Sequence, residues 1–413
     1  MKVFKFFIKE IFLKKILVAI SVFLMIFLSN YLVFTAMRSA LSTLEGYKEV
    51  SHLNQENSFI SNLDPESNFD MGAFSESDFR RIYDYLDENF SYGMFANGFI
   101  VTPPNSYNME ASCAYINETY YKLNKFRLSQ GTGLEFDYDL KEDSEIPVII
   151  GSGLSKDYPL DSTIQIVDPA LSKDITLRVK GILEQDYHRS NIYALNSKEY
   201  YNFSIIIPAN KEFIDQSNIG LQDQGLSDMI ILDTSENKIE SLKETIYENT
   251  GLKYNFFTQE ENFGYFKEYY IDSLRSILIV SMIISLVLIL ITIWCSLSGI
   301  NMMIKDFTIN LFAGLSYKKL RKILYGYYGI LFVINLLILY AIIAFSNRGY
   351  WLRKEILSVS FGILGLTNMD WLALIGVIIF DLIIGVLIVE ILLHKIKKVP
   401  ISLGVLQWKK LLI

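Results

Sequence analysis

The chain contains little cysteine and histidine, and these residues are widely scattered. Only 2 of its 413 residues are cysteines: Cys113 lies in a polar region and Cys295 in an apolar one, so we expect no disulfide between them. The polar region must therefore be stabilised by its apolar core. The 3 histidines, His52, His188 and His394, are far apart in the chain and predict no metal site.

Several motifs of nucleotide binding and catalysis are also missing. The sequence has no G-x-x-x-x-G-K-[ST] loop, no G-x-S-x-G elbow and no H-E-x-x-H helix. ATP binding by a P-loop is thereby excluded, and hydrolase chemistry has no basis. The nearest glycine-rich sequence, Gly151-Ser152-Gly153, lacks the third glycine of a dinucleotide loop, and we interpret it as a turn from a strand into a helix. We therefore expect no enzyme activity and no cofactor.

Long apolar segments are the main feature that is present. Four of them are long enough for a helix to cross a hydrocarbon core: residues 16–37, 276–304, 323–347 and 371–393. The first three carry no charged side chain, and the fourth carries only Asp381 and Glu390. A long polar insert separates the first segment from the other three.

The charges around these segments predict an orientation. The N-terminal residues, the segment between the second and third apolar runs and the C-terminal tail are all rich in lysine, so we expect them to be cytoplasmic. The insert and the loop before the last apolar run then lie outside. Most of the 45 acidic residues fall in the insert, which disfavours nucleic acid as a partner and permits a cationic peptide.

These patterns predict an α-helical membrane protein with four transmembrane helices and a large α+β extracytoplasmic domain between helices one and two. The predicted segments are, in order, an amphipathic cytoplasmic segment 1–15, transmembrane helix 16–37, the external domain with helical stalks 38–275, transmembrane helix 276–300, a cytoplasmic coupling segment 301–322, transmembrane helix 323–347, an extracellular loop 348–370, transmembrane helix 371–393 and a cytoplasmic tail 394–413.

Within the insert, helix and strand signals alternate. We expect helices at 75–90 and 235–250, and strands at 95–101, 229–232 and 252–257, with further strands between 146 and 208. The strand–helix–strand order suggests a split, ferredoxin-like sheet, and the central strands suggest a separate lobe. Helical stalks are expected at both ends of the insert. Residues 60–255 are expected to fold alone.

The coupling segment is the strongest local signal. We expect a short apolar helix that ends at Gly314, with Ser316 capping the next helix. Apolar side chains on a cytoplasmic loop need a cover, either a partner protein or the membrane surface. The candidate contact residues are Lys305, Asp306, Phe307, Ile309, Leu311, Phe312, Gly314 and Leu315.

Asp381 is the second candidate, because a charge near the middle of a membrane span is costly. We expect a buried structural acid that is hydrogen-bonded to a serine or tyrosine of another span; a role in proton or substrate handling is the alternative. Glu390 lies near the basic end and is expected to pair with a lysine such as Lys395.

Two groups of residues resemble a known family. Lys305, Asp306, Ile309 and the sequence Gly314-Leu315-Ser316 are similar to the cytoplasmic loop of FtsX/MacB-type ABC transporter permeases. The strand sequences that begin at Val148, Thr163 and Val179 resemble the core of the MacB-like extracytoplasmic domain. Together with the arrangement of spans, the resemblance covers essentially the whole chain.

This resemblance implies a permease subunit that pairs with a second permease subunit, identical or related, and with separate cytoplasmic ABC ATPases. It implies mechanotransmission to the external domain, for export of a peptide, antimicrobial or lipid-linked substrate. Two alternatives stay open. One is an FtsX-like regulator that transports nothing and acts on an external cell-wall hydrolase as accessory protein; the other is a peptide-sensing membrane receptor.

Overall fold

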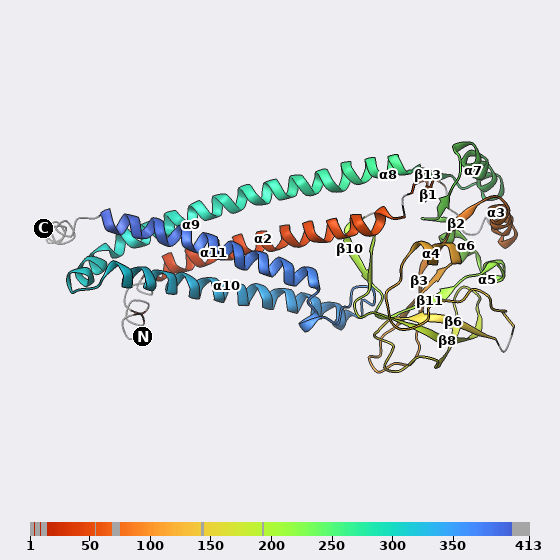
Figure 1. The fold of residues 1–413 in the computed structure, drawn as a ribbon, viewed down its shortest axis with the longest axis horizontal. Coiled ribbons are helices and arrows are strands. Elements are labelled where there is room, and N and C mark those ends of the chain that lie inside the picture. The colour runs from red at the N-terminus through yellow and green to blue at the C-terminus, as the bar shows by residue number, and fades with distance from the viewer. Residues whose placement is uncertain are drawn as a thin grey trace. The chain divides into compact units, whose positions relative to one another are not determined.

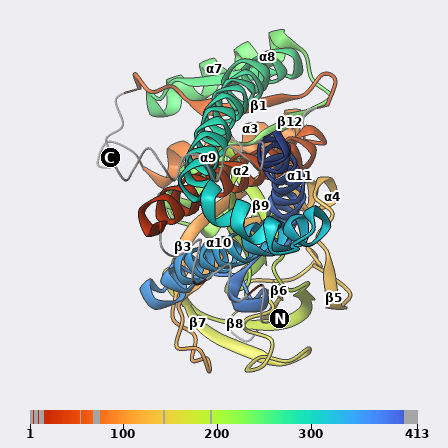
Figure 2. The same ribbon diagram turned by 90° about the vertical axis from the view of Figure 1, so that its left-hand side faces the viewer.

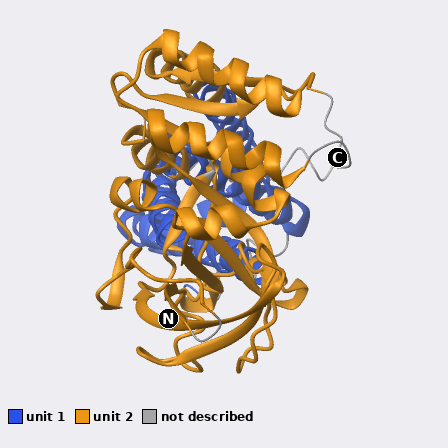
Figure 3. Cartoon of the chain, turned by 90° about the vertical axis from the view of Figure 1, so that its right-hand side faces the viewer, with its two compact units in different colours: residues 1–41, 274–346, 368–413 blue, residues 42–273, 347–367 orange. Residues whose placement is uncertain are grey.

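The computed structural model describes residues 4, 9, 15–53, 55–67, 75–141, 144–191 and 194–398. The predicted amphipathic segment 1–15 and the tail after Lys398 therefore lie largely outside the described residues. The chain forms two compact units (Figure 3): unit 1 comprises residues 1–41, 274–346 and 368–413, and unit 2 comprises residues 42–273 and 347–367.

Unit 1 consists of the greater part of four long helices, which lie side by side within it (Figure 2). They are α2 (Ile16–Ser51), α9 (Ser273–Phe312), α10 (Tyr317–Arg353) and α11 (Asn368–Lys398). Each is long and apolar enough to cross a membrane. Their shared core includes Ile26, Phe307, Leu324 and Val389, one from each helix. The four predicted spans thus coincide with four helices, each of which continues beyond its apolar run.

The first sheet of unit 2 has four antiparallel strands (Figure 1): β1 (Phe59–Leu63), β2 (Ser91–Gly93), β12 (Ile230–Leu232) and β13 (Tyr254–Thr258), in the order β13-β1-β12-β2. Helix α3 (Glu76–Asn89) connects β1 to β2, and α7 (Glu236–Thr250) connects β12 to β13. Two interleaved strand–helix–strand units in this order form a ferredoxin-like sheet. The split sheet is therefore as predicted, although its strand after α3 is β2 rather than the segment 95–101.

Both helices of this sheet begin and end where their sequence signals indicate. Ser75 precedes α3, and its backbone N–H donates to Asp78 Oδ2 at 3.0 Å, as in a capping box. Gly251 ends α7 in the left-handed conformation, with φ of 68°. A residue without a Cβ adopts this conformation at low cost, which explains why the helix stops there.

The second sheet of unit 2 is inserted between β2 and β12. Its strands are β3 (Phe95–Val101), β4 (Ala111–Ile116), β5 (Leu128–Gly131), β6 (Glu145–Ile150), β7 (Thr163–Asp168), β8 (Lys173–Leu183) and β11 (Ser204–Pro208). The order is β3-β4-β11-β6-β8-β5, and β7 also pairs with β8. The short helices α4 (Glu118–Leu123), α5 (Lys211–Gln216) and α6 (Ile219–Leu226) lie in the connections.

Two expectations about this region need correction. One core cluster includes Phe79 and Leu242 beside the first sheet as well as Val148 and Ile205 in the second, so the central strands are not a separate lobe. No helix follows Gly151 directly. The backbone N–H of Gly151 instead donates to Ser204 O at 2.8 Å, and the chain continues in turns.

The remaining elements of unit 2 are a pair of strands, the segment between β13 and α9, and residues 347–367. A hairpin joins β9 (His188–Asn191) to β10 (Ala194–Tyr200). After β13, α8 (Gln259–Tyr265) continues into a π-helix, η4 (Phe266–Asp272), and then into α9. Residues 347–367 contain the end of α10 and a short 3-10 helix, η5 (Ile363–Gly365).

Candidate functional site

The coupling segment is the end of a long helix rather than a helix of its own. α9 runs without interruption from Ser273 to Phe312. The next turn has the hydrogen bonds of a Schellman motif: Leu315 N donates to Asn310 O at 3.0 Å, and Gly314 N donates to Leu311 O at 3.1 Å. Gly314 has φ of 95°, which favours glycine at this position. The predicted stop at Gly314 is thus observed, while the expected separate helix is not.

The candidate residues of this segment divide between two faces. Phe307 is completely buried in the core of unit 1, and Leu311 and Leu315 pack against the same core. Ile309 and Phe312 are 54% and 77% exposed. Phe307 therefore cannot serve as an anchor for a partner, which corrects the expectation from the sequence. The expectation could not separate the faces because every second or third residue in this segment is apolar.

Charged residues lie on the exposed side of the same helix end. Lys305 and Asp306 are both exposed, about one turn before Ile309. Ser316, after the turn, precedes α10 and accepts a hydrogen bond from Lys319 N at 3.3 Å. The result is a helical hairpin tip that presents two large apolar side chains beside charged ones. Such a surface suits a partner with a groove for apolar anchors and a polar rim.

The acids of the fourth span have partners other than the ones expected. Asn30 on α2 donates through Nδ2 to Asp381 Oδ2 at 3.1 Å, and both side chains are buried. The partner of Asp381 is thus an asparagine instead of a serine or tyrosine. Glu390 lies 2.9 Å from Arg321 Nη2 rather than pairing with Lys395, and it accepts a hydrogen bond from Tyr325 Oη at 3.1 Å.

A cluster of four charged side chains joins the stalk part of α2 to the β9–β10 hairpin within unit 2. Lys198 Nζ lies 3.1 Å from Glu45 Oε2 and 3.4 Å from Glu49 Oε2. His188 Nε2 lies 3.3 Å from Glu45 Oε2 and 3.4 Å from Glu49 Oε1. Ser190 also donates its backbone N–H to Glu49 Oε2 at 2.9 Å. Two carboxylates thus face two basic groups.

The charge states in this cluster follow from its geometry. Burial would lower the pKa of His188, but the contacts with Glu45 and Glu49 outweigh it and raise this pKa to about 9. Burial would raise the pKa of Glu49, but the contacts with His188, Ser190 and Lys198 lower it to about 2. At neutral pH His188 is therefore protonated and Glu49 is ionised.

The same cluster is the one group of potential metal ligands in the described part of the chain. Two observations argue against a metal ion there. Lys198 already supplies positive charge to both carboxylates, and it is only 7% exposed. A protonated His188 also has no lone pair for a metal. We interpret the group as an ionic contact between stalk and domain. Glu45 and Glu49, four residues apart on one helix face, were the sequence signal for it.

The two stalk segments meet in unit 2. Tyr47 of α2 packs against Phe263 of α8 and Phe266 of η4, with ring centroids 6.1 and 6.5 Å apart. Beyond the stalks, Phe59 at the start of β1 pairs with Thr258 at the end of β13. The two helical stalks predicted from the sequence therefore lead into adjacent ends of neighbouring strands.

Residues 347–367 dock on the domain, a contact that the sequence did not reveal. Trp351 and Phe361 pack on Phe203 of the second sheet, with ring centroids 5.8 Å away in both cases. Tyr200 N donates to Leu357 O at 2.7 Å, and Asn202 Nδ2 donates to Val359 O at 2.9 Å. The mixture of aromatic and aliphatic residues in this loop was the available signal.

Comparisons with known proteins add a likeness to a solved structure. No family model matches the chain, and no curated protein matches it. Among solved structures, the extracellular domain of YknZ, described as a noncanonic ABC-type transporter from Gram-positive bacteria, is similar to 49% of this chain and to 100% of its own. The sequence identity is 14% and the TM-score is 0.30. A likeness at this level carries no argument about function.

Proposed function

We propose that this protein is the membrane-spanning permease subunit of an ABC transporter. The observation that carries the proposal is the tip of the α9–α10 hairpin, where Ile309 and Phe312 are 54% and 77% exposed beside Lys305 and Asp306. In this role the tip binds a separate cytoplasmic ATPase, and the chain itself hydrolyses no ATP. The likeness of this segment to the loop of FtsX/MacB-type permeases supports the same assignment.

The proposed orientation puts both termini and the hairpin tip in the cytoplasm, and unit 2 outside. The support is the lysine-rich sequence of the N-terminal residues, of the segment 305–322 and of the tail. The tip can bind a cytoplasmic ATPase only if it lies in the cytoplasm, so the docking role of the tip requires this orientation.

In the proposed mechanism, ATP-driven movement of the cytoplasmic subunits is transmitted to unit 2 along continuous helices. The support is the chain path from β13 through α8 and η4 into α9, which contains no loop. A helix without a break transmits displacement along its axis, whereas a flexible linker would absorb it. A second permease subunit, identical or related, completes the assembly. The exported substrate would be a peptide, an antimicrobial or a lipid-linked molecule.

The test is a double substitution at the tip, Ile309→Ala with Phe312→Ala. Truncation of a buried interface anchor costs about 1–4 kcal/mol of binding. The variant should therefore lose the ABC ATPase during purification from its native membrane, and the associated ATP hydrolysis should be lost with it. Because neither side chain is buried in unit 1, the insertion and the fold of the chain should be unchanged.

A matched control is available in the spans. Ile283 and Phe345 are 53% and 77% exposed, almost the same as the tip residues, but they lie within apolar segments. Ile283→Ala with Phe345→Ala should retain the ATPase. Retention of the ATPase at wild-type stoichiometry by the tip variant would contradict the proposal.

A further inference from the structure

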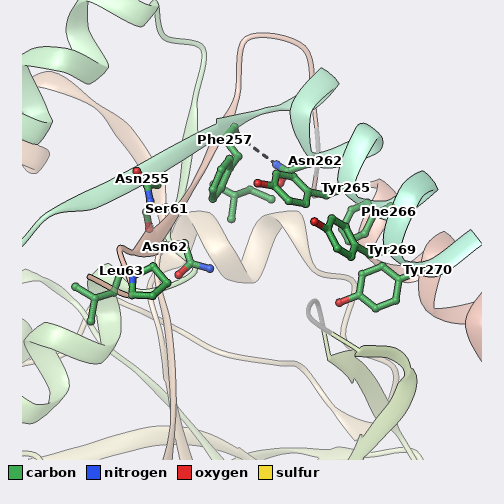
Figure 4. Close-up of a pocket in the computed structure, with 12 residues that line it drawn as sticks. Ser61, Asn62, Leu63, Asn255, Phe257, Asn262, Tyr265, Phe266, Tyr269 and Tyr270 are labelled. Atoms are coloured by element: carbon green, nitrogen blue, oxygen red, sulfur yellow. Dashed lines mark hydrogen bonds between the residues drawn. The ribbon is translucent and has the colours of Figure 1, made fainter. Parts of the chain in front are cut away.

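Two pockets of unit 2 differ in chemistry. One, of about 640 Å³, lies beside β1 and β13 and has a wall of aromatic side chains from α8 and η4, such as Tyr265 and Tyr269 (Figure 4). The other, of about 560 Å³, is lined by the end of α2, the end of α4 with the residues that follow it, and β9. Five of its described lining residues are lysine or arginine: Lys48, Lys122, Lys125, Arg127 and Arg189. Such a group of basic side chains is unexpected in an insert that holds most of the acidic residues of the chain.

The acidic residues of this basic pocket do not neutralise it. Glu45 and Glu49 are the acids in its described lining. Both belong to the cluster that joins α2 to the β9–β10 hairpin, whose two basic groups lie 3.1 to 3.4 Å from their oxygen atoms. Their negative charge is thus offset within that cluster. The residues next to this lining in the chain that the structure does not describe are Asn54 and 192–193, and none of them carries a charge at neutral pH.

Some of the basic residues have acidic partners of their own. Lys122 Nζ lies 2.7 Å from Glu118 Oε1, and Arg127 Nε lies 3.6 Å from Glu184 Oε2. The other three have no carboxylate within ion-pair distance in the described part of the chain: Lys48, Lys125 and Arg189. The pocket therefore presents three positive charges that these residues do not compensate, and this excess favours an anionic ligand.

Arg189 is the cation whose position is best defined. Its guanidinium group lies over the rings of Phe95 and Tyr120, 4.2 and 5.2 Å from their centroids. No described residue accepts a hydrogen bond from this group, and Glu199 and Asp228 attract it only from beyond ion-pair distance. Stacking on aromatic faces holds the plane of a guanidinium and leaves the N–H groups at its edge for an anion.

We propose that this pocket binds a ligand that carries a phosphate group. A phosphate monoester has about 1.5 to 2 negative charges at neutral pH and three acceptor oxygens, which suits several cations better than the single charge of a carboxylate. The fork of Arg189 can donate two parallel hydrogen bonds to it. The volume of about 560 Å³ is that of a site for a larger molecule, so the phosphate belongs to a soluble ester or to a lipid head group. This inference does not depend on ATPase binding at the hairpin tip, so either can fail alone.

The test measures binding by calorimetry to the full chain in phosphatidylcholine nanodiscs, with empty nanodiscs as the blank. The probes are glycerol phosphate, dihexanoyl phosphatidic acid, which adds short acyl chains to the same group, and glycerate, which has a carboxylate in place of the phosphate. We expect saturable binding of the phosphate probes that weakens as salt is added, and weaker binding of glycerate. Tighter binding of dihexanoyl phosphatidic acid than of glycerol phosphate identifies a lipid head group as the source, and the reverse order identifies a soluble ester.

Two variants test the location of the site. Lys48→Gln with Lys125→Gln removes two exposed charges and should weaken phosphate binding about tenfold. Arg189→Gln should also weaken it by about tenfold or more, because it removes the guanidinium fork and the charge. Lys238→Gln is the matched control, since Lys238 is an exposed lysine on α7 that does not line the pocket, and it should change nothing.

Three results would overturn the proposal. The first is no saturable binding of either phosphate probe, and the second is binding of glycerate as tight as that of glycerol phosphate. The third is unchanged phosphate affinity in the variant with Lys48→Gln and Lys125→Gln. The melting temperature of each variant shows whether a lost affinity merely reflects unfolding. If Arg189→Gln lowers it, the lysine variant decides, because both lysines are exposed.

Discussion

The stalk segments and residues 347–367 are joined to unit 2 in different ways. The stalk helices α2 and α8 lead into the neighbouring strands β1 and β13, which pair along their whole length. Residues 347–367, all of which the structure describes, contribute no strand and are held by contacts alone. The stalk connection therefore cannot separate without disrupting the four-stranded sheet, whereas the loop can leave the domain as a unit.

The two attachments also differ in chemistry. The stalk adds a cluster of four charged groups, with Lys198 and His188 facing Glu45 and Glu49. The loop uses aromatic packing and hydrogen bonds, and it contains no histidine. Electrostatic contacts respond to pH and salt, while apolar burial responds mainly to changes in side-chain volume. The difference predicts that each attachment is sensitive to a different perturbation.

The largest effect is expected at the loop. Trp351 packs against Phe361 and Phe203, and its Nε1 donates to Ser360 O at 3.1 Å. Trp351→Ala should weaken docking of the loop by about 2–4 kcal/mol, because it removes a large aromatic side chain and leaves a cavity. The measurement is the hydrogen-exchange rate of the Tyr200 amide, which donates to Leu357 O at 2.7 Å and should exchange faster when the loop is weakly docked.

Leu352→Ala is the matched control, since the neighbouring Leu352 is 72% exposed. It should leave the protection of the Tyr200 amide unchanged. Equal protection in wild type and Trp351→Ala would show that backbone hydrogen bonds alone hold the loop, and the distinction between the two attachments would then be lost.

The second effect concerns the charged cluster. Lys198 is only 7% exposed, and its removal leaves the carboxylates of Glu45 and Glu49 close together with one cation fewer. Lys198→Met should lower the free energy of unfolding by about 1–3 kcal/mol. The double variant Lys198→Met with Glu45→Gln restores charge balance and should recover part of the loss. Thermal unfolding of the full chain in nanodiscs measures both.

Recovery in the double variant is the decisive comparison. The cluster does not act through charge pairing if Lys198→Met is as stable as wild type. The same conclusion follows if Glu45→Gln lowers the stability of the Lys198→Met variant as much as it lowers that of the wild type. The stalk would then be held by the strands and by the packing of Tyr47 alone.

Local signals predicted much of this fold from the sequence. Ser75 and Gly251 mark a helix start and a helix end, and the structure places α3 and α7 accordingly. Strands such as β3 and β6 coincide with sequences rich in β-branched and aromatic residues. These features depend on residues close together in the chain, so a sequence contains the necessary information.

The features that were missed depend on residues far apart in the chain. The partner of Asp381 is Asn30, 351 positions earlier, and Asp186 accepts a hydrogen bond from the backbone of Phe361. Residues 60–255 are an incomplete domain for the same reason, because Val359 belongs to the core cluster of unit 2 and β13 ends at Thr258. No local pattern specifies such contacts. The buried state of Phe307 was missed because the apolar pattern did not distinguish the two faces of α9.

The smallest effect is a pH dependence that only the stalk attachment should show. The folded protein raises the pKa of His188 from its ordinary value of 6.5 to about 9. A raised pKa means that the folded state binds the proton more tightly than the unfolded state. The resulting stabilisation is fully present below pH 6.5 and is lost as the pH rises through about 9.

The depressed pKa of Glu49 has the opposite consequence. Its stabilisation is present above the ordinary value of 4.5 and is lost as the pH falls through about 2. Glu49 therefore contributes no change near neutrality. The loss of stability at alkaline pH therefore belongs to His188. This residue lies on β9 and faces Glu45 and Glu49 of α2. On β10 its neighbours are Tyr200 and, through the shared contact with Glu45, Lys198.

Between pH 6.5 and about 7.5, this linkage should lower the stability of the stalk contact by about 1 kcal/mol. The measurement is hydrogen exchange of the Ser190 amide, which donates to Glu49 Oε2, after correction for the intrinsic effect of pH on exchange. His188→Gln should flatten the dependence, because glutamine does not titrate. The Tyr200 amide, which reports on the loop, is the internal reference. A pH dependence of equal size at both amides would mean that the two attachments open together, since a single opening event exposes both.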